Sequence, residues 1–137
     1  MKLRVNELRP LLALLLVYGA ASLVHFTHNA QFLAEYPNLP SSWSPALVYV
    51  AWIGMTTTGV LGWLLFSRGA QFTGLLVLVV YAALGLDSLG HYVLAPMSAH
   101  SAAMNWTILL EVTAAGCVLL EVTRQAGRLF DQERKRS

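Results

Sequence analysis

The sequence predicts an all-α integral membrane protein, built as a bundle of four helices. Of its 137 residues, 56% are hydrophobic, and the mean hydropathy of +0.57 is too high for an ordinary soluble domain. A helix that crosses a bilayer needs about 20 mostly apolar residues. Four segments meet this requirement, at residues 8–32, 46–66, 72–94 and 102–122. They leave almost no chain for anything else, so we expect a single transmembrane domain, 1–137, in contact with the lipid bilayer.

The basic residues predict how the four segments are oriented. Lysine and arginine in short loops stay on the cytoplasmic side of a membrane. Here they precede the first segment, separate the second from the third and follow the fourth: Lys2, Arg4, Arg9, Arg68, Arg124, Arg128, Arg134, Lys135 and Arg136. The other two connections contain neither residue type. We therefore expect a multi-pass protein of a bacterial plasma (inner) membrane, with both termini in the cytoplasm.

The first segment has one rival interpretation, a secretory signal peptide. A basic start, an apolar run and the small residues Gly19, Ala20 and Ala21 would suit a signal peptidase. The apolar character continues to Phe32, however, which is longer than a signal core. We therefore interpret the segment as a membrane span.

The fourth segment is followed by the basic stretch "RQAGRLFDQERKRS". We expect it to be a short cytoplasmic tail that extends the fourth helix and meets anionic lipid head groups. The chain has no separate basic domain with interleaved aromatic residues, so we expect no nucleic-acid partner. The single cysteine, Cys117, allows no disulfide within the chain.

The polar residues inside the spans carry the functional prediction. Such residues are costly in a bilayer, face the interior of the bundle and mark functional sites. The first and third spans run outward and the fourth runs inward, so all four histidines fall at the same, outer level of the membrane: His25, His28, His91 and His100. Residues three or four positions apart share a helix face. This spacing groups His25 with His28 and Asn29, and Asp87 with His91.

Imidazole nitrogens suit zinc, copper and iron, and carboxylates or amides complete or orient such sites. We therefore predict a transition-metal site whose ligands come from five residues: His25, His28, Asp87, His91 and His100. Asn29 and Asn105 are expected to orient the ligands by hydrogen bonds. Glu111 lies about three turns below His100, so we expect it, or Asp87, to handle protons as a catalytic residue. A polar anchor at the interface is the alternative role for His100.

The stretch "DSLGHYVLAPMSAH" is similar in spacing to the copper ligands in the C subunit of particulate methane monooxygenases. The resemblance covers Asp87, His91 and His100, with a shorter loop and without the rest of that much larger subunit. It implies a copper-type ligand geometry and no membership of that family. An open coordination position would make the protein a metal-dependent enzyme acting on a lipophilic substrate, whereas a closed one would indicate metal binding or delivery. Whether the protein is an enzyme stays open.

Two other functions fit the same residues. In the first, His28 and His91 are the axial ligands of a b-type haem in an electron-transfer or accessory subunit of a larger membrane complex. Gly19, Gly85 and Gly90 would supply part of the slot that a haem needs. In the second, the protein is a small proton-coupled carrier without chemistry. Four short spans would then form a homodimer to make a pathway.

A faint internal repeat is also present. A shift of 63 residues superposes Tyr18 on Tyr81 and His28 on His91. This pattern predicts two pseudo-repeated helical hairpins around an axis along the membrane normal. Apolar sequences match easily, so coincidence is the alternative.

Overall fold

A computed structural model describes residues 5–135 of the chain. Lys2, Arg4 and Arg136, which contribute to the predicted orientation, lie outside the described residues. All the regular secondary structure in the described part is helical, and this part contains no strand. Their bounds are α1 (Val5–Gln31), η1 (Leu33–Glu35), α2 (Pro45–Ser67), α3 (Gln71–Leu86), η2 (Asp87–Leu89), α4 (Gly90–Leu94), η3 (Met97–Ala99) and α5 (Ala102–Arg134). The predicted all-α class is confirmed.

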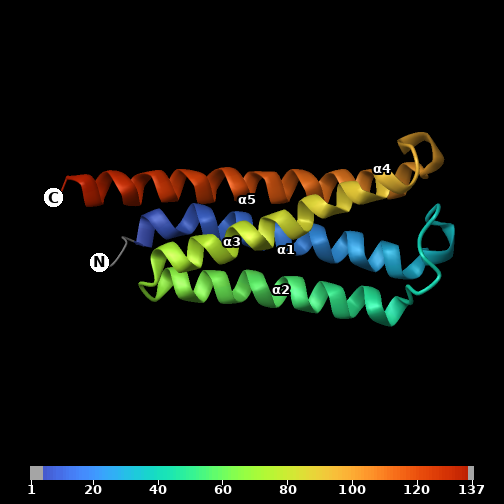
Figure 1. The fold of residues 1–137 in the computed structure, drawn as a ribbon, viewed down its shortest axis with the longest axis horizontal. Helices are drawn as coiled ribbons and strands as arrows, with labels where there is room; N and C mark the ends of the chain where they lie inside the picture. Colours follow the sequence, from blue (N-terminus) through green and yellow to red (C-terminus); the bar gives the residue numbers. More distant parts are fainter. Residues whose placement is uncertain (1–4, 136–137) are drawn as a thin grey trace.

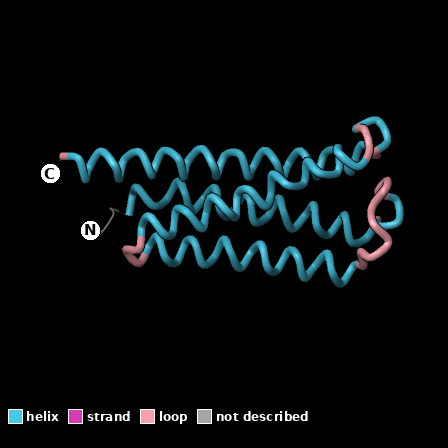
Figure 2. Tube along the Cα trace, viewed as in Figure 1, coloured by secondary structure: helices cyan, strands magenta, loops and turns pink. Residues whose placement is uncertain are grey.

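The long helices lie side by side along the length of the molecule (Figures 1 and 2). α1 begins and α5 ends at one end of the bundle, where the tight turn between α2 and α3 also lies (Figure 1). We call this the turn end. The opposite end holds the two longer connections, residues 32–44 and 95–101, and we call it the loop end.

Four helical stretches are long and apolar enough to cross a membrane: Leu8–Gln31, Pro45–Ser67, Gln71–Leu94 and Ala102–Arg134. The shortest has 23 residues and measures about 35 Å at 1.5 Å per residue, against a hydrocarbon thickness of about 30 Å. Many large apolar side chains point away from the bundle, and Trp106 and Leu120 are 75% and 74% exposed. Apolar surface of this kind belongs in lipid. The chain is therefore a membrane protein with four spans.

The helix boundaries have local causes in the sequence. The Ser44 side chain accepts a hydrogen bond from the Leu47 amide and Pro45 opens α2, which is a favourable N-terminus. The Ser101 side chain caps α5 in the same way by accepting from the Met104 amide. At the turn end, Gly69 has a φ of +105°, which favours glycine and lets the chain reverse after α2.

The third span differs from the uninterrupted segment that the sequence predicts. Its α-helix ends at Leu86, and residues Asp87–Leu89 form a 3₁₀ turn before α4 completes the span. A 3₁₀ helix has three residues per turn, so it changes the direction in which the following side chains point. The fourth helix, by contrast, continues to Arg134, and the expected helical extension into the tail is confirmed.

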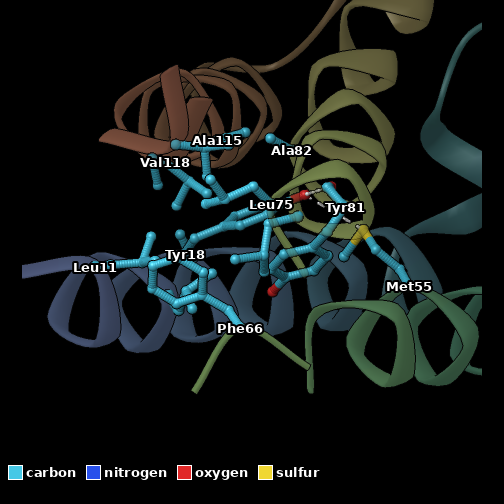
Figure 3. Packing of buried hydrophobic residues seen from close by; sticks show 14 of the residues in the cluster. Leu11, Tyr18, Met55, Phe66, Leu75, Tyr81, Ala82, Ala115 and Val118 are labelled. Atoms are coloured by element: carbon cyan, nitrogen blue, oxygen red, sulfur yellow. Dashed lines mark hydrogen bonds between the residues drawn. The ribbon is translucent and has the colours of Figure 1, made fainter. Parts of the chain in front are cut away.

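The core between the helices is centred on two tyrosines (Figure 3). The fully buried Tyr18 donates a hydrogen bond from its hydroxyl to the backbone oxygen of Tyr81 (3.0 Å), and the ring centroids lie 4.4 Å apart. Small residues let the helices approach closely: a Cβ at Gly74 would overlap the backbone of Phe66, and a Cβ at Gly85 would overlap the Tyr18 ring. This packed core fixes the positions of the helices along one another, and therefore the positions of the residues at the loop end.

Candidate functional site

All four histidines lie at the loop end, around a tyrosine that the sequence analysis did not single out. Tyr36 follows η1 and is only 4% exposed. Its ring centroid lies 4.9 Å from that of His91, 6.0 Å from His28 and 6.4 Å from His100. Its hydroxyl is hydrogen-bonded to Nδ1 of His28 at 3.0 Å. The expected convergence of histidines therefore exists in this structure, with Tyr36 at its centre.

The first long connection folds back over the helices and thereby buries Tyr36. Asn38 adopts a positive φ of 59°, a conformation that asparagine tolerates better than most residues. Its side-chain amide donates to the backbone oxygen of Leu94 at 2.9 Å. Burial raises the pKa of Tyr36 to about 12, so its hydroxyl keeps its proton at physiological pH.

Two further ring contacts continue the cluster from α1 towards α5. The centroids of His25 and His91 are 5.5 Å apart, and those of His91 and His100 are 6.2 Å apart, both in edge-on geometry. Nδ1 of His100 donates to the backbone oxygen of Pro96 at 3.1 Å. Nε2 of the same ring is buried and has no hydrogen-bond partner in the described part of the chain.

The deepest part of the site is a pair formed by His25 on α1 and Glu111 on α5. Nε2 of His25 lies 3.7 Å from Oε2 of Glu111, and the two residues are 1% and 0% exposed. The Ser88 hydroxyl donates to the same carboxylate oxygen at 2.5 Å. Oε1 of Glu111 has no hydrogen-bond partner among the described residues. We expected Glu111 to handle protons, but its contact with His25 had no counterpart in the sequence analysis.

The hydrogen bonds around His25 indicate which of its two ring nitrogens carries a proton. The Thr107 hydroxyl donates its only hydrogen to the backbone oxygen of Met104 at 3.0 Å. It therefore accepts from Nδ1 of His25, 3.2 Å away. In that arrangement Nδ1 holds a proton, and Nε2, which lies near the carboxyl group, is left without one. Nε2 of His25 and Oε2 of Glu111, 3.7 Å apart, are close neighbours without a hydrogen bond between them.

A cleft opens beside this pair, between the loop-end parts of α1, α2, α3 and α4. It has a volume of about 470 Å³ and a largely apolar wall. Five polar side chains line it, namely His25, Asn29, Asp87, Ser88 and His91. Pockets of this size with a few polar groups in an apolar wall are typical of small-molecule sites. The cleft meets the buried pair at His25 and at Ser88.

The structure places the remaining predicted site residues around the cleft or behind it. The Asn29 amide lies 3.4 Å from Nε2 of His91 and donates to it; its role in orienting a metal ligand stays a prediction. Asn105 accepts from the Tyr92 hydroxyl and donates to the backbone oxygens of Met97 and His100. It therefore holds the second connection in place and makes no contact with the cleft.

The donors do not form a metal site as they stand. Within residues 5–135, no group of three or more histidine, cysteine, aspartate or glutamate side chains is arranged so that it could hold a metal ion. One nitrogen of His28 is bonded to Tyr36 and one nitrogen of His100 to Pro96. The ring of Tyr36 packs against both His28 and His91, the expected haem ligands. Metal and haem binding stay predictions, and no step below passes through either.

No protein-family model, no curated protein and no solved structure matches the chain. The fold and the site therefore define its class by themselves. It is a four-helix membrane protein in which a buried histidine–glutamate pair borders a cleft at the loop end.

Proposed function

We propose that this protein binds a lipophilic small molecule in the loop-end cleft and exchanges a proton with it through His25 and Glu111. One observation carries the proposal. His25 is one of the residues that line the cleft, and Nε2 of its ring lies 3.7 Å from the buried carboxyl group of Glu111. A proton that leaves or reaches the ligand therefore has an adjacent acceptor and donor, shielded from water.

Ser88 offers a second connection between the ligand and the pair. Its side chain lines the cleft, and its hydroxyl donates to Glu111. A ligand group that replaces this hydrogen bond would alter the proton affinity of the carboxyl group. Binding and protonation are therefore coupled, whether the protein acts as a carrier or promotes a proton-transfer reaction on the ligand.

The distribution of basic residues supports a proposal for the side of the membrane on which the cleft lies. Between Arg9 and Arg124 the chain contains a single lysine or arginine, Arg68, which lies at the turn end. Because basic loops stay in the cytoplasm, the loop end faces the extracytoplasmic side in this proposal, in a bacterial plasma (inner) membrane. A lipophilic ligand would reach the cleft from the outer leaflet.

A transition metal is the competing occupant of the same region. It is favoured by Nε2 of His100, a buried nitrogen without a hydrogen-bond partner among the described residues. The lack of a three-donor group in residues 5–135 speaks against it. A metal would require the histidine rings to move, whereas a small molecule fits the cleft in its present form.

The proposal is tested by the pH dependence of binding a ligand that does not itself titrate. The ligand is a long-chain primary alcohol, and the protein is held in lipid nanodiscs. The signal is the fluorescence of Trp43, which lines the cleft, in a variant whose other tryptophans are replaced by phenylalanine. We expect the alcohol to change this fluorescence with an affinity that varies between pH 5 and pH 9. Any such variation must come from the protein.

Glu111→Gln should keep the binding and remove its pH dependence, because the amide cannot exchange the proton. The matched control is Glu121→Gln, which alters the other buried glutamate of α5; Glu121 is bonded to Gln125 and Arg124 far from the cleft. The control should behave like the unmodified chain. The proposal is overturned if the alcohol leaves Trp43 unaffected, or if the pH dependence survives in Glu111→Gln.

A further inference from the structure

We infer that the ligand is a single-tailed amphiphile whose neutral or cationic head donates hydrogen bonds in the cleft and whose tail lies in a groove between α1 and α2. This inference rests on the proposed function, because it names the class of molecule that the same site would bind. Two observations support it: a second cavity between α1 and α2, and the charged and polar groups around the loop-end cleft.

The second cavity runs between α1 and α2 within the membrane-spanning region. It has a volume of about 420 Å³ and a wall that is almost entirely apolar. Gly19 and Gly59 keep it open, because they have no side chain where larger residues would fill the space between the helices. Tyr81 of α3 closes the groove from behind, and a Cβ at Gly59 would lie only 2.7 Å from its ring.

The cleft and the groove follow one another along the same two helices, α1 and α2. On α2, Val48 lines the cleft, and the groove follows it at Trp52, Thr56, Gly59 and Trp63, at steps of three or four residues. Such steps keep side chains on one helix face. From Val48 to Trp63 the helix rises about 22 Å, which is the length of a long hydrocarbon tail.

The same continuity holds on α1. Gly19 and Leu23 line the groove, and Phe26, three residues further along the chain, lines the cleft. Trp52 lies at the boundary, where its indole N–H donates to the Ser22 hydroxyl at 3.2 Å. One molecule with a polar end and an apolar end would therefore occupy both cavities without a change in direction.

The charges at the loop end select the head of this molecule. Asp87 is exposed on the cleft wall, and Glu111 lies behind His25 and Ser88. No lysine or arginine occurs between Arg9 and Arg68 or between Arg68 and Arg124, so an anionic head would meet carboxyl groups without a compensating cation. Oδ1 of Asn29 is a buried acceptor that has no partner among the described residues. An amine or hydroxyl head supplies what these groups lack, whereas a phosphate or carboxylate head does not.

The test uses three probes with the same sixteen-carbon tail, which is roughly the length that the groove can accommodate. Each tail has a photoreactive diazirine near its end. The probes differ only in the head, which is an amine, a hydroxyl or a carboxylate. Each probe is irradiated with the unmodified protein in nanodiscs, and the adducts are located by peptide mass spectrometry. We expect the amine and the alcohol to label α1 and α2 along the groove and to bind at least about tenfold more tightly than the carboxylate, a difference of about 1.4 kcal/mol.

Gly19→Leu should fill the groove and reduce this labelling at least about tenfold, by blocking the tail from its apolar contacts. A Cβ at Gly19 meets nothing closer than 4.0 Å, so the variant is compatible with the fold. Gly54→Leu is the matched control, because Gly54 is an exposed residue of α2 outside both cavities, where an added Cβ would meet no atom within 4 Å. If Gly19→Leu does not insert into the membrane, the adduct map of the unmodified protein decides the question alone.

The outcomes separate this inference from the proposed function. Adducts scattered over the lipid-facing surface, together with a response of Trp43 to the probes, overturn the tail site and leave the cleft as a binding site. Equal or tighter binding of the carboxylate probe overturns the inferred head chemistry. A Trp43 signal that no probe changes overturns the proposed function and this inference with it.

Discussion

Nε2 of His25 on α1 lies 3.7 Å from Oε2 of Glu111 on α5, and both side chains are almost completely buried. A carboxyl group in an apolar bundle is unfavourable unless a partner compensates for its lost hydration. Here the partners are an imidazole and the Ser88 hydroxyl. In the proposed function, the same arrangement also handles a proton.

Removing one member of this pair should destabilise the bundle. We expect His25→Phe to lower the free energy of unfolding by about 1–3 kcal/mol, because Thr107 would lose its hydrogen bond to the ring and Glu111 its nearby polar partner. Unfolding of the purified protein in mixed micelles measures this loss. The double variant with Glu111→Leu should recover most of it. A double variant as unstable as the sum of the two single changes would show that the residues do not interact.

The burial of Tyr36 predicts a loss of stability at high pH. A tyrosine in the unfolded chain ionises near pH 10.0, whereas burial raises the pKa of Tyr36 to about 12. The contribution of this residue is therefore complete below pH 10 and declines as the pH rises towards 12. Tyr36→Phe should make the free energy of unfolding fall less steeply across this range.

The same substitution removes the hydrogen bond to His28, which should cost about 0.5–1.5 kcal/mol at neutral pH. Tyr49→Phe, at an exposed position of α2, is the control for the loss of a tyrosine hydroxyl as such. Unfolding measured at pH 9, 10 and 11 compares the three proteins. Parallel pH profiles for all of them would contradict the prediction.

The orientation in the membrane can be measured with single cysteines. In a Cys117→Ser background, Ser41→Cys reports on the loop end and Glu133→Cys on the end of α5, and both positions are exposed. We expect a membrane-impermeant maleimide to label the first in intact cells and the second only after lysis. The reverse pattern would place the cleft on the cytoplasmic side.

The geometry of the donors also bears on the metal content. Because residues 5–135 contain no group of three suitable donors as they are arranged here, the predicted metal site requires the histidine rings to move, and the metal content of protein purified without chelators tests it. Elemental mass spectrometry and an absorbance spectrum measure this directly. One metal ion per chain that is lost in a His28→Ala, His91→Ala double variant would favour the metal site over the proposed function. A Soret band lost in that variant would favour haem.

The sequence was sufficient to predict the four spans and the common level of the histidines. Both follow from simple counting, because the rise per residue is fixed and the spans alternate in direction. It was not sufficient for the partner of Glu111. The sequence predicts the depth of Glu111 only relative to His100 on the same helix, whereas its contact is His25 on α1. The register between two helices depends on packing that no single helix encodes.

Tyr36 and Asp87 show two other features that the sequence alone does not predict. Tyr36 belongs to a connection, and its burial depends on the backbone conformation of Asn38 and on a hydrogen bond to Leu94, 56 residues away. Asp87 was paired with His91 on the assumption of a regular α-helix. The 3₁₀ turn that begins at Asp87 changes the direction of the side chains that follow it. Both residues line the cleft, and their joint role as ligands stays a prediction.

The hydrogen bond from Asn38 to Leu94 ties the first loop-end connection to the end of the third span, and residues of both segments line the cleft. The groove between α1 and α2, in contrast, is bordered by Leu16 and Val60, which are more than half exposed on the lipid-facing surface. A ligand that enters sideways along this groove never has to cross the aqueous phase. Its occupancy would then follow its mole fraction among the surrounding lipids, and binding constants for this protein are best expressed on that scale.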